Sequence, residues 1–336
     1  MKKPKLLFLG GTQFIGRNIV HKLMAIDEYE ITLFNRQQTG NDLFPNIAKI
    51  KGDRTTDDIQ QIANENWDYV IDCSCYHPDD LENTLANLKP NIKRYIFIST
   101  SSVYDNEALQ TTLRNEDSPV LSCSIKQREN KEKKVFYGNK KSECERILKA
   151  SNLNSIILRP TLVFGTYDYT DRFYYWLYQV KTNDTLLLPD NGNRKFSLIY
   201  VHDLVKMTIL SLTTEVSGQA QNTDNQTFNI ISFPQTSIRE IVETAQDLLN
   251  RKNTIINATP EFLHENKVNQ WTTMPLWIDH DFFTYSNERL KSEFPIQLTD
   301  FETATAETIA YYESLNWHQP TYGMNEAKRQ ELLSKL

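Results

Sequence analysis

The feature that most constrains this 336-residue chain is a short apolar run that ends in two glycines, KLLFLGGTQFIG at 5–16. The unbroken apolar run predicts a strand that is buried on both faces, as in a parallel sheet. The glycines predict a tight turn where the backbone approaches a ligand closely, followed by a helix packed against the strand. Free N–H groups at the start of such a helix suit a pyrophosphate. The stretch therefore predicts the phosphate end of a dinucleotide site, formed by Gly10, Gly11, Gln13, Phe14, Ile15 and Gly16.

Gln13 departs from the dinucleotide-binding fingerprint, which has a glycine at this middle position to admit the pyrophosphate. The Gln13 side chain either faces outward or makes the phosphate site wider. A glycine fingerprint alone also occurs in incidental turns. Here it follows a predicted strand and precedes apolar residues at helical spacing, which favours a βαβ unit.

Alternating strand and helix patterns continue along the first two thirds of the chain. Apolar runs predict further strands at 31–34, 47–50, 69–72, 94–99 and 155–158, with helical periodicity between several of them. This alternation predicts an α/β protein with a Rossmann-type, doubly wound parallel sheet and a smaller C-terminal substrate-binding region. We expect the NAD(P)-binding domain at 1–165 and 195–232, and the substrate-binding region at 166–194 and 233–336. The segment 105–134 lacks apolar periodicity and is interpreted as an exposed excursion with charges of mixed sign.

Composition limits the environment and the partners of the chain. The sequence has no 18-residue apolar run and no charged-then-apolar leader, so we expect a soluble, cytoplasmic protein without a membrane partner. A net charge of −6 disfavours general electrostatic binding of nucleic acid. The four cysteines lack a metal-type spacing and are interpreted as reduced, chemically idle thiols, with a redox or metal pair at Cys73 and Cys75 as the alternative. We expect no metal.

The end of the second predicted strand bears on the choice of cofactor. Asn35 and Arg36 occupy the place where an acidic residue would bind the adenosine ribose hydroxyls. Arg36 can instead face a 2′-phosphate, which tilts the prediction from NAD toward NADP; the alternative is a solvated surface charge. Asp53, which follows the third strand, is placed for the adenine edge.

Tyr137 and Lys141 lie four residues apart at the start of a predicted helix, so their side chains project from one face. A phenol with a pKa near ~10 is a poor acid–base catalyst at neutral pH, but a nearby ammonium group favours the phenolate. This spacing is common by chance. A hydroxyl group at Thr100, at the end of the fifth predicted strand, strengthens the case for a reaction site.

Several motifs in order resemble the NAD-dependent epimerase/dehydratase family of extended or atypical short-chain dehydrogenases/reductases. They are GGTQFIG (10–16), ISTSSVY (98–104), YGNKK (137–141) with Glu145 following, ILRPTLVFG (157–165), YVHDL (200–204) and FNI (228–230). DYTDRFYYW (168–176) and WTTMPLW (271–277) resemble a bacterial subgroup whose substrates are mostly unassigned. The resemblance implies that Thr100 is the catalytic serine or threonine, that Tyr137 is the acid–base residue, and that Lys141 holds the nicotinamide ribose and lowers the Tyr137 pKa.

The family's sugar-nucleotide dehydratases place Asp-Glu directly after that threonine, whereas this chain has Ser101 and Ser102. The resemblance therefore implies hydride transfer at a carbinol carbon, as in an epimerase or a reductase, on a nucleotide-sugar. Arg172 and Arg194 are candidate clamps for its diphosphate, with solvated surface charges as the alternative.

Two other functions compete with this interpretation. The glycine stretch also resembles chloroplast stem-loop-binding proteins on the same fold, which implies an RNA-binding protein. The third hypothesis is a redox sensor that holds its cofactor without turnover. As partners we expect a small-molecule substrate and a second copy of the chain in a homodimer.

Overall fold

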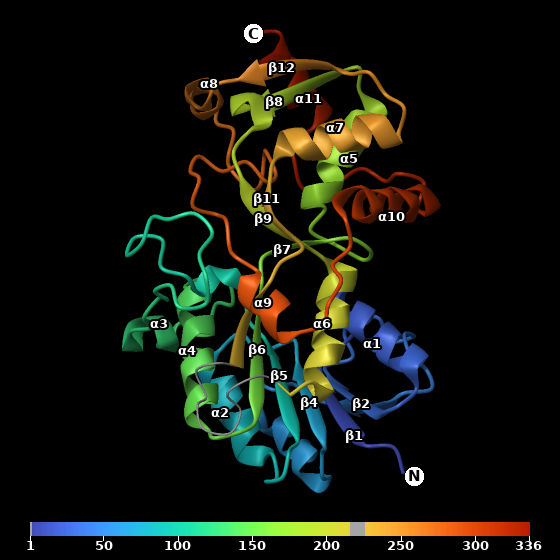
Figure 1. Ribbon diagram of the computed structural model, residues 1–336, viewed down its shortest axis with the longest axis vertical. Helices are drawn as coiled ribbons and strands as arrows, with labels where there is room; N and C mark the ends of the chain where they lie inside the picture. Colours follow the sequence, from blue (N-terminus) through green and yellow to red (C-terminus); the bar gives the residue numbers. More distant parts are fainter. Residues whose placement is uncertain (1, 216–225) are drawn as a thin grey trace.

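A seven-stranded parallel sheet lies at the centre of the computed structural model, which describes residues 2–215 and 226–336 (Figure 1). Its strand order is β10-β6-β5-β4-β1-β2-β3. The strands are β1 (Lys5–Leu9), β2 (Glu30–Asn35), β3 (Ala48–Lys51), β4 (Tyr69–Asp72), β5 (Arg94–Ile98), β6 (Ser155–Pro160) and β10 (Thr227–Ile230). The chain runs from β1 to β3 in one direction and from β4 to β6 in the other, which is the doubly wound arrangement. The predicted Rossmann-type fold is confirmed.

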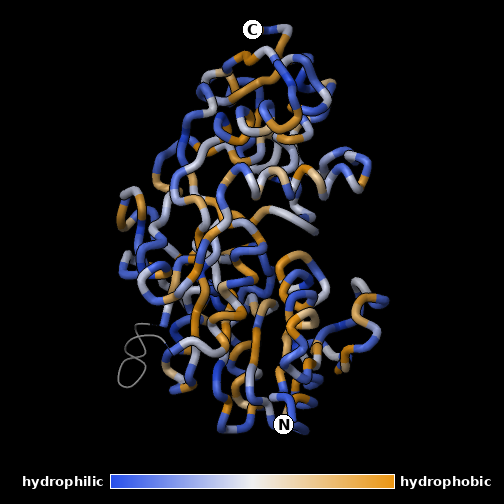
Figure 2. Tube along the Cα trace, turned by 45° about the vertical axis from the view of Figure 1, so that its right-hand side comes forward, coloured by the Kyte–Doolittle hydropathy of each residue, from blue (hydrophilic) through white to orange (hydrophobic). Residues whose placement is uncertain are grey.

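Helices cover both faces of this sheet, because its strands are apolar on both sides. Helices α1 (Phe14–Ile26) and α6 (Val201–Thr213) contact each other on one face, and α2 (Pro78–Asn87) and α4 (Tyr137–Ala150) on the other. In β1, Leu6 and Phe8 belong to the core cluster on the α1 side, whereas Leu7 and Leu9 belong to the cluster on the α4 side. Figure 2 shows hydrophobic residues concentrated along the strands, as this two-sided burial requires.

The rest of the chain builds an upper region above the carboxyl ends of these strands (Figure 1). It contains a three-stranded sheet and a two-stranded sheet, which helices pack against. The three-stranded sheet is β7 (Leu162–Phe164), β9 (Phe196–Tyr200) and β11 (Phe233–Thr236), and the two-stranded sheet is β8 (Thr185–Pro189) and β12 (Thr254–Ala258). The helices are α5 (Arg172–Thr182), α7 (Ile238–Leu248), α8 (Pro260–Glu265), α10 (Phe301–Ser314) and α11 (Glu326–Leu333). Trp176 and Trp277 are buried in the core of this region.

One late helix, α9 (Glu288–Glu293), returns to the large sheet. Leu290 belongs to the core cluster of that sheet, and the ring of Phe294 lies 5.0 Å from that of Phe228 in β10. The segment 233–336 therefore contributes to both regions, and the division into two domains remains a proposal.

Shorter elements complete the connections. They are the 3₁₀ helices η1 (Asp57–Asn64), η2 (Ser101–Val103) and η3 (Asp190–Gly192), and the α-helix α3 (Ile125–Glu129) within the excursion after β5. Within the described ranges, every helix is too short or too polar to cross a lipid bilayer.

Candidate functional site

The glycine turn after β1 is formed as the sequence predicts. Gly10 and Gly11 have φ values of +109° and +99°, which favour glycine. The side chain of Asn35 fixes the turn, because its Nδ2 donates to the Gly10 carbonyl at 3.0 Å. A Cβ atom on Gly16 would lie 3.0 Å from the Gly11 backbone, so a glycine is required where α1 crosses the turn. The residues thus fit the pyrophosphate of a dinucleotide.

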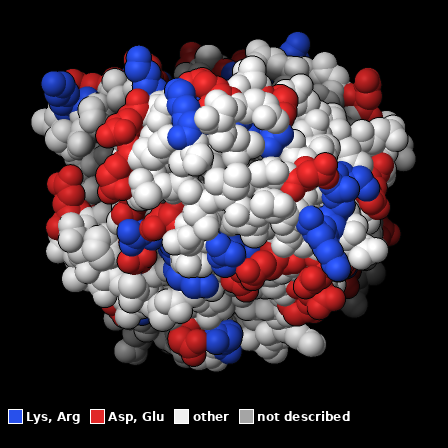
Figure 3. Space-filling model, turned by 90° about the horizontal axis from the view of Figure 1, so that it is seen from above, with Lys and Arg blue, Asp and Glu red and all other residues white. Residues whose placement is uncertain are grey.

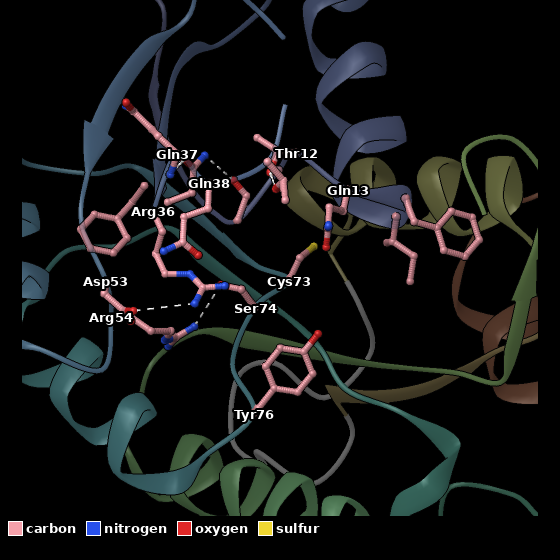
Figure 4. Close-up of a pocket in the computed structure, with 18 of the residues that line it drawn as sticks. Thr12, Gln13, Arg36, Gln37, Gln38, Asp53, Arg54, Cys73, Ser74 and Tyr76 are labelled. Carbon is pink, nitrogen blue, oxygen red and sulfur yellow. Dashed lines mark hydrogen bonds and ion pairs between the residues drawn. The ribbon is translucent and has the colours of Figure 1, made fainter. Parts of the chain in front are cut away.

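Gln13 precedes the first residue of α1 with φ −124° and ψ 150°, an extended conformation that any residue can adopt. Its side chain is exposed and lines a cavity at the carboxyl end of β1 (Figure 4). The choice between an outward-facing side chain and a wider phosphate site stays a prediction.

A cavity of about 380 Å³ opens at the carboxyl ends of β1 to β4 (Figure 4). It is lined by every cofactor residue expected from the sequence except Lys141, namely Gly10, Gly11, Gln13, Phe14, Ile15, Gly16, Asn35, Arg36 and Asp53. The Arg36 guanidinium lies 3.9 Å from the Asp53 carboxylate. Partial burial raises the pKa of Asp53, but hydrogen bonds from Thr55 and the charges of Arg36 and Lys133 outweigh it and hold this pKa below its ordinary value.

Arg54 also lines this cavity, although sequence reasoning did not select it. Its Nη1 lies 2.7 Å from Oδ1 of the fully buried Asp72, and its Nη2 donates to Thr84 at 2.8 Å. The hydroxyl of Tyr95 donates to the other Asp72 oxygen at 2.8 Å. The charge of Arg54 is therefore paired with that of Asp72 within the wall of the cavity.

Thr100 and Tyr137 come together where β5 ends and α4 begins. Thr100 caps η2, and its Oγ1 accepts from Ser102 N at 3.1 Å. Burial raises the pKa of Tyr137 to about 12, while a hydrogen-bonding interaction with Thr100 opposes the rise. The ring of Tyr76, a cavity residue absent from our sequence-based set, lies 6.1 Å from that of Tyr137.

Lys141 is placed differently from the expectation. Its buried Nζ donates to the Cys75 carbonyl at 3.1 Å and to the Ile98 carbonyl at 2.7 Å. It joins the ends of β4 and β5 and is not among the groups that shift the Tyr137 pKa. Burial dominates the pKa of Tyr137, and the Lys141 ammonium group is engaged with two carbonyl oxygens, so the lowering of that pKa by Lys141 stays a prediction.

Gly138 is a further site residue that the sequence analysis missed. A Cβ atom on it would overlap the Ser102 carbonyl oxygen and lie 2.9 Å from Leu121 Cδ1. The absence of a side chain lets the first turn of α4 reach η2, which brings Tyr137 to Thr100. Only its position directly after the tyrosine could have indicated this role.

The two arginines expected to clamp a diphosphate lie apart from the cavity described above. Arg172 begins α5 and its Nε donates to Thr170 Oγ1 at 3.2 Å. Arg194 pairs with Asp190 at 2.8 Å and with Asp281 at 3.0 Å. Neither lines this cavity or the neighbouring one.

That neighbouring cavity, of about 540 Å³, lies between the start of α1 and the end of α10. It shares Thr12, Gln13, Phe14, Thr39 and Tyr169 with the first cavity. The two cavities therefore meet at the glycine turn.

The four cysteines are free thiols. Cys75 and Cys144 are buried with their sulfur atoms 4.0 Å apart, whereas Cys73 lines the first cavity. Among the described residues, His, Cys, Asp and Glu side chains form no cluster of three suited to a metal ion.

Comparison with solved structures supports the fold. UDP-glucose 4-epimerase from Thermotoga maritima, solved with UDP-glucose, superposes with a TM-score of 0.70 at 15% identity, covering 93% of this chain and 99% of that one. dTDP-glucose 4,6-dehydratase from Bacillus anthracis, solved with NAD, gives a TM-score of 0.68 at 19% identity, covering 98% and 99%.

Two curated proteins are similar over part of their length. The chloroplast stem-loop binding protein of 41 kDa b from Arabidopsis thaliana is 24% identical over 232 residues, which cover 65% of this chain. UDP-glucose 4-epimerase from Vibrio cholerae is 27% identical over 188 residues, which cover 49% of this chain. The matches span 57% and 53% of those two proteins.

The model of one family matches residues 6–230, which include the glycine turn, Thr100, Tyr137 and Lys141. This match covers the large sheet from its first strand to its last. The chain belongs to the NAD dependent epimerase/dehydratase family.

Proposed function

We propose that this protein binds NAD(P) and transfers hydride at a carbinol carbon of a nucleotide-sugar, as an epimerase or a reductase. The observation that carries the proposal is the meeting of Thr100 and Tyr137 at the edge of the sheet that also holds the glycine turn. The similarity to nucleotide-sugar epimerases supports the substrate class.

The proposed roles follow from the protonation and placement of the side chains. With a pKa of about 12, Tyr137 is a neutral phenol at pH 7 and can donate its proton to a substrate oxygen. Thr100 would hold the same oxygen through its hydroxyl group. The bound cofactor would supply or accept the hydride, and we propose that Lys141 orients its nicotinamide ribose from the junction of β4 and β5.

We propose that the cofactor is NADP in preference to NAD, because Arg36 follows β2 and Asn35 directs its side chain to the glycine turn. Calorimetric titration with NAD(H) and NADP(H) tests this choice. Equal affinities would remove it.

The reaction is tested by incubating the protein with a panel of UDP- and dTDP-sugars and separating the products chromatographically. We expect a 4-epimer or a reduced sugar to form with wild type and to be nearly absent with Tyr137→Phe. Equal conversion by both proteins would contradict the proposed mechanism.

RNA binding is the second candidate, favoured by the similarity to the Arabidopsis stem-loop binding protein. On the face shown in Figure 3, basic and acidic side chains are interspersed. Electrophoretic shift of a stem-loop RNA at 150 mM salt separates the two functions. Submicromolar binding, together with no affinity for either dinucleotide, would favour the RNA-binding reading.

We further propose that the protein is cytoplasmic and homodimeric, and that Arg172 and Arg194 contact the substrate diphosphate. The latter requires Arg194 to leave Asp190 and Asp281. Arg194→Ala should then raise KM with little change in kcat.

A further inference from the structure

A segment that the sequence predicts to be an exposed excursion contributes one residue, Lys133, to the wall of the cofactor cavity. We call residues 124–136 the strap. It begins with a capping box in which Ser124 and Gln127 bond each other's backbone N–H groups at the start of α3. It ends at Phe136, directly before Tyr137. The strap therefore leads into the helix that carries the proposed catalytic tyrosine.

Contacts with α2 hold the strap on one side. Arg128 pairs with Asp79 at 2.8 Å and with Glu82 at 2.5 Å, and Lys131 pairs with Asp79 at 2.9 Å. The ring of His77, the residue before α2, lies 2.6 Å from the Arg128 carbonyl oxygen. These contacts fix the strap up to two residues before Lys133.

A buried lysine holds the strap from the side of α4. Lys140 is fully buried, and its Nζ donates to the carbonyl oxygens of Asn130 at 3.1 Å and Glu132 at 2.6 Å. The second acceptor belongs to the residue directly before Lys133. The backbone at Lys133 is therefore positioned by tertiary contacts, unlike that of a free loop.

Lys133 is the residue of the strap that lines the cofactor cavity. Its Nζ lies 5.2 Å from the centre of the Tyr76 ring, and its charge acts with that of Arg36 to lower the Asp53 pKa. The ammonium group therefore lies beside Tyr76 in the cavity wall, within range of the Asp53 charge.

Lys133 differs from the two arginines of the cavity wall in having no carboxylate partner of its own among the described residues. Arg36 lies 3.9 Å from Asp53, and Arg54 is paired with Asp72. Lys133 forms no ion pair within the described part of the chain. Asp80, the other acidic residue of the wall, is partly buried, which raises its pKa. Lys133 therefore supplies a positive charge that an additional anion can use.

We propose that Lys133 is a specificity-determining residue for the cofactor: together with Arg36 it binds a 2′-phosphate and gives the protein its preference for NADP(H). The inference rests on the proposed dinucleotide site. The Arg36 guanidinium already lies 3.9 Å from the Asp53 carboxylate, so the strap supplies a second positive charge for the 2′-phosphate.

The test measures binding of 2′,5′-ADP and 5′-AMP by calorimetry, because these nucleotides differ only in the 2′-phosphate. We expect wild type to bind 2′,5′-ADP about 10-fold or more tightly than 5′-AMP, as one charge-assisted contact provides. Lys133→Gln should reduce this ratio by about 5- to 10-fold and leave the affinity for 5′-AMP within about 2-fold. Lys134→Gln is the matched control, because Lys134 is an exposed strap residue outside the cavity wall. Its ratio should equal that of wild type.

The outcomes separate this inference from the proposed function. An unchanged ratio in Lys133→Gln overturns the inference, while binding of 5′-AMP upholds the dinucleotide site. An equal loss for both nucleotides also overturns it, because Lys133 would then act on the part that they share. If wild type binds neither nucleotide, the proposed function falls and the inference falls with it. Circular dichroism confirms that each variant is folded.

Discussion

Glu145 and Arg159 form a buried ion pair that joins helix α4 to the end of strand β6. Nη2 of Arg159 lies 2.6 Å from Oε2 of Glu145, and each side chain is only 3% exposed. The Ser99 hydroxyl donates to Oε1 of the same carboxylate at 2.5 Å. Because Ser99 precedes Thr100 and Glu145 lies two turns after Tyr137, this carboxylate connects the supports of both proposed catalytic residues.

Removal of this carboxylate should be strongly destabilising. Glu145→Ala leaves the Arg159 guanidinium buried without its partner, which typically costs about 3–5 kcal/mol in free energy of unfolding. Glu145→Gln keeps an acceptor for Ser99 and should cost less. Urea unfolding followed by circular dichroism measures both. A loss below about 1 kcal/mol in Glu145→Ala would show that water compensates the arginine charge.

Gly138→Ala should separate Tyr137 from Thr100. The added methyl group overlaps the Ser102 carbonyl, so α4 must move away from η2, at a cost of about 1–3 kcal/mol typical of overpacking. We expect turnover to fall at least as much as the loss in free energy of unfolding would account for. The affinity for the dinucleotide should fall less. Steady-state rates and nucleotide titration measure the two effects. Wild-type turnover in this variant would argue against the need for close contact between α4 and η2.

Tyr137→Phe should reduce turnover by about 10²-fold or more, because it removes the proton donor and keeps the ring. Thr100→Ala should be milder, since the Ser102 hydroxyl lies 3.2 Å from Thr100 Oγ1 and remains available, whereas Ser101 is buried. Cofactor affinity should be retained in both variants. A rate of Tyr137→Phe within twofold of wild type would contradict the assignment.

The pKa of Tyr137 predicts that pH affects the forward and reverse reaction rates differently. Since this pKa is about 12, the phenol stays protonated from pH 6 to 9, so proton donation to a substrate oxygen should not vary with pH through this group. The reverse step needs the phenolate and should accelerate as pH rises through this range. Rates in both directions between pH 6 and 9 provide the measurement. A reverse rate that is flat with pH would indicate another base.

Asp168→Asn should stabilise the protein at neutral pH. Burial raises the pKa of Asp168 to about 6, above its value in the unfolded chain, so the native state binds this proton more tightly. The carboxyl group therefore favours folding below pH 4 and loses this contribution as pH rises to 6, a change of about 3 kcal/mol. Asparagine keeps an acceptor for the Thr170 N–H and hydroxyl. Its melting temperature should exceed that of wild type at pH 7.5 and approach it at pH 4.5. If the melting temperatures of the variant and wild type differ by the same amount at both pH values, the effect arises from packing and not from titration of Asp168.

Lys140→Met should loosen the strap without touching the cofactor cavity. The variant keeps the apolar stem and loses both carbonyl contacts, so Lys133 should be held less firmly. We expect the ratio of 2′,5′-ADP to 5′-AMP affinity to fall by about 2- to 5-fold, less than in Lys133→Gln, because the charge of Lys133 is still present. Lys126→Met, at an exposed position of the same segment, is the control. An unchanged ratio would mean that the contacts of the strap with α2 are enough to hold Lys133 in place.

The large sheet was predictable because its signals are local. The glycine turn follows an apolar strand directly, and the predicted strand at 69–72 coincides with β4. Strands β8 and β12 were missed, because they pair with each other in parallel across a long sequence separation that no local pattern reveals. The sequence placed Thr100 at the end of a strand and Tyr137 at the start of a helix, and both lie there, although their catalytic roles stay predictions. The contacts of Lys141 and the position of Lys133 could not be predicted, since both depend on carbonyl groups that only the tertiary fold brings near.

The return of α9 to the large sheet has a consequence for protein engineering. The chain crosses between the two regions several times, and Leu290 and Phe294 complete a core that began with β1. An exchange of the upper region between relatives, made to alter the substrate, would therefore need several junctions instead of one. A truncation after β11 would leave Phe228 of β10 without the ring that packs against it, so the large sheet should not be expressed as a stable fragment from residues before 237 alone.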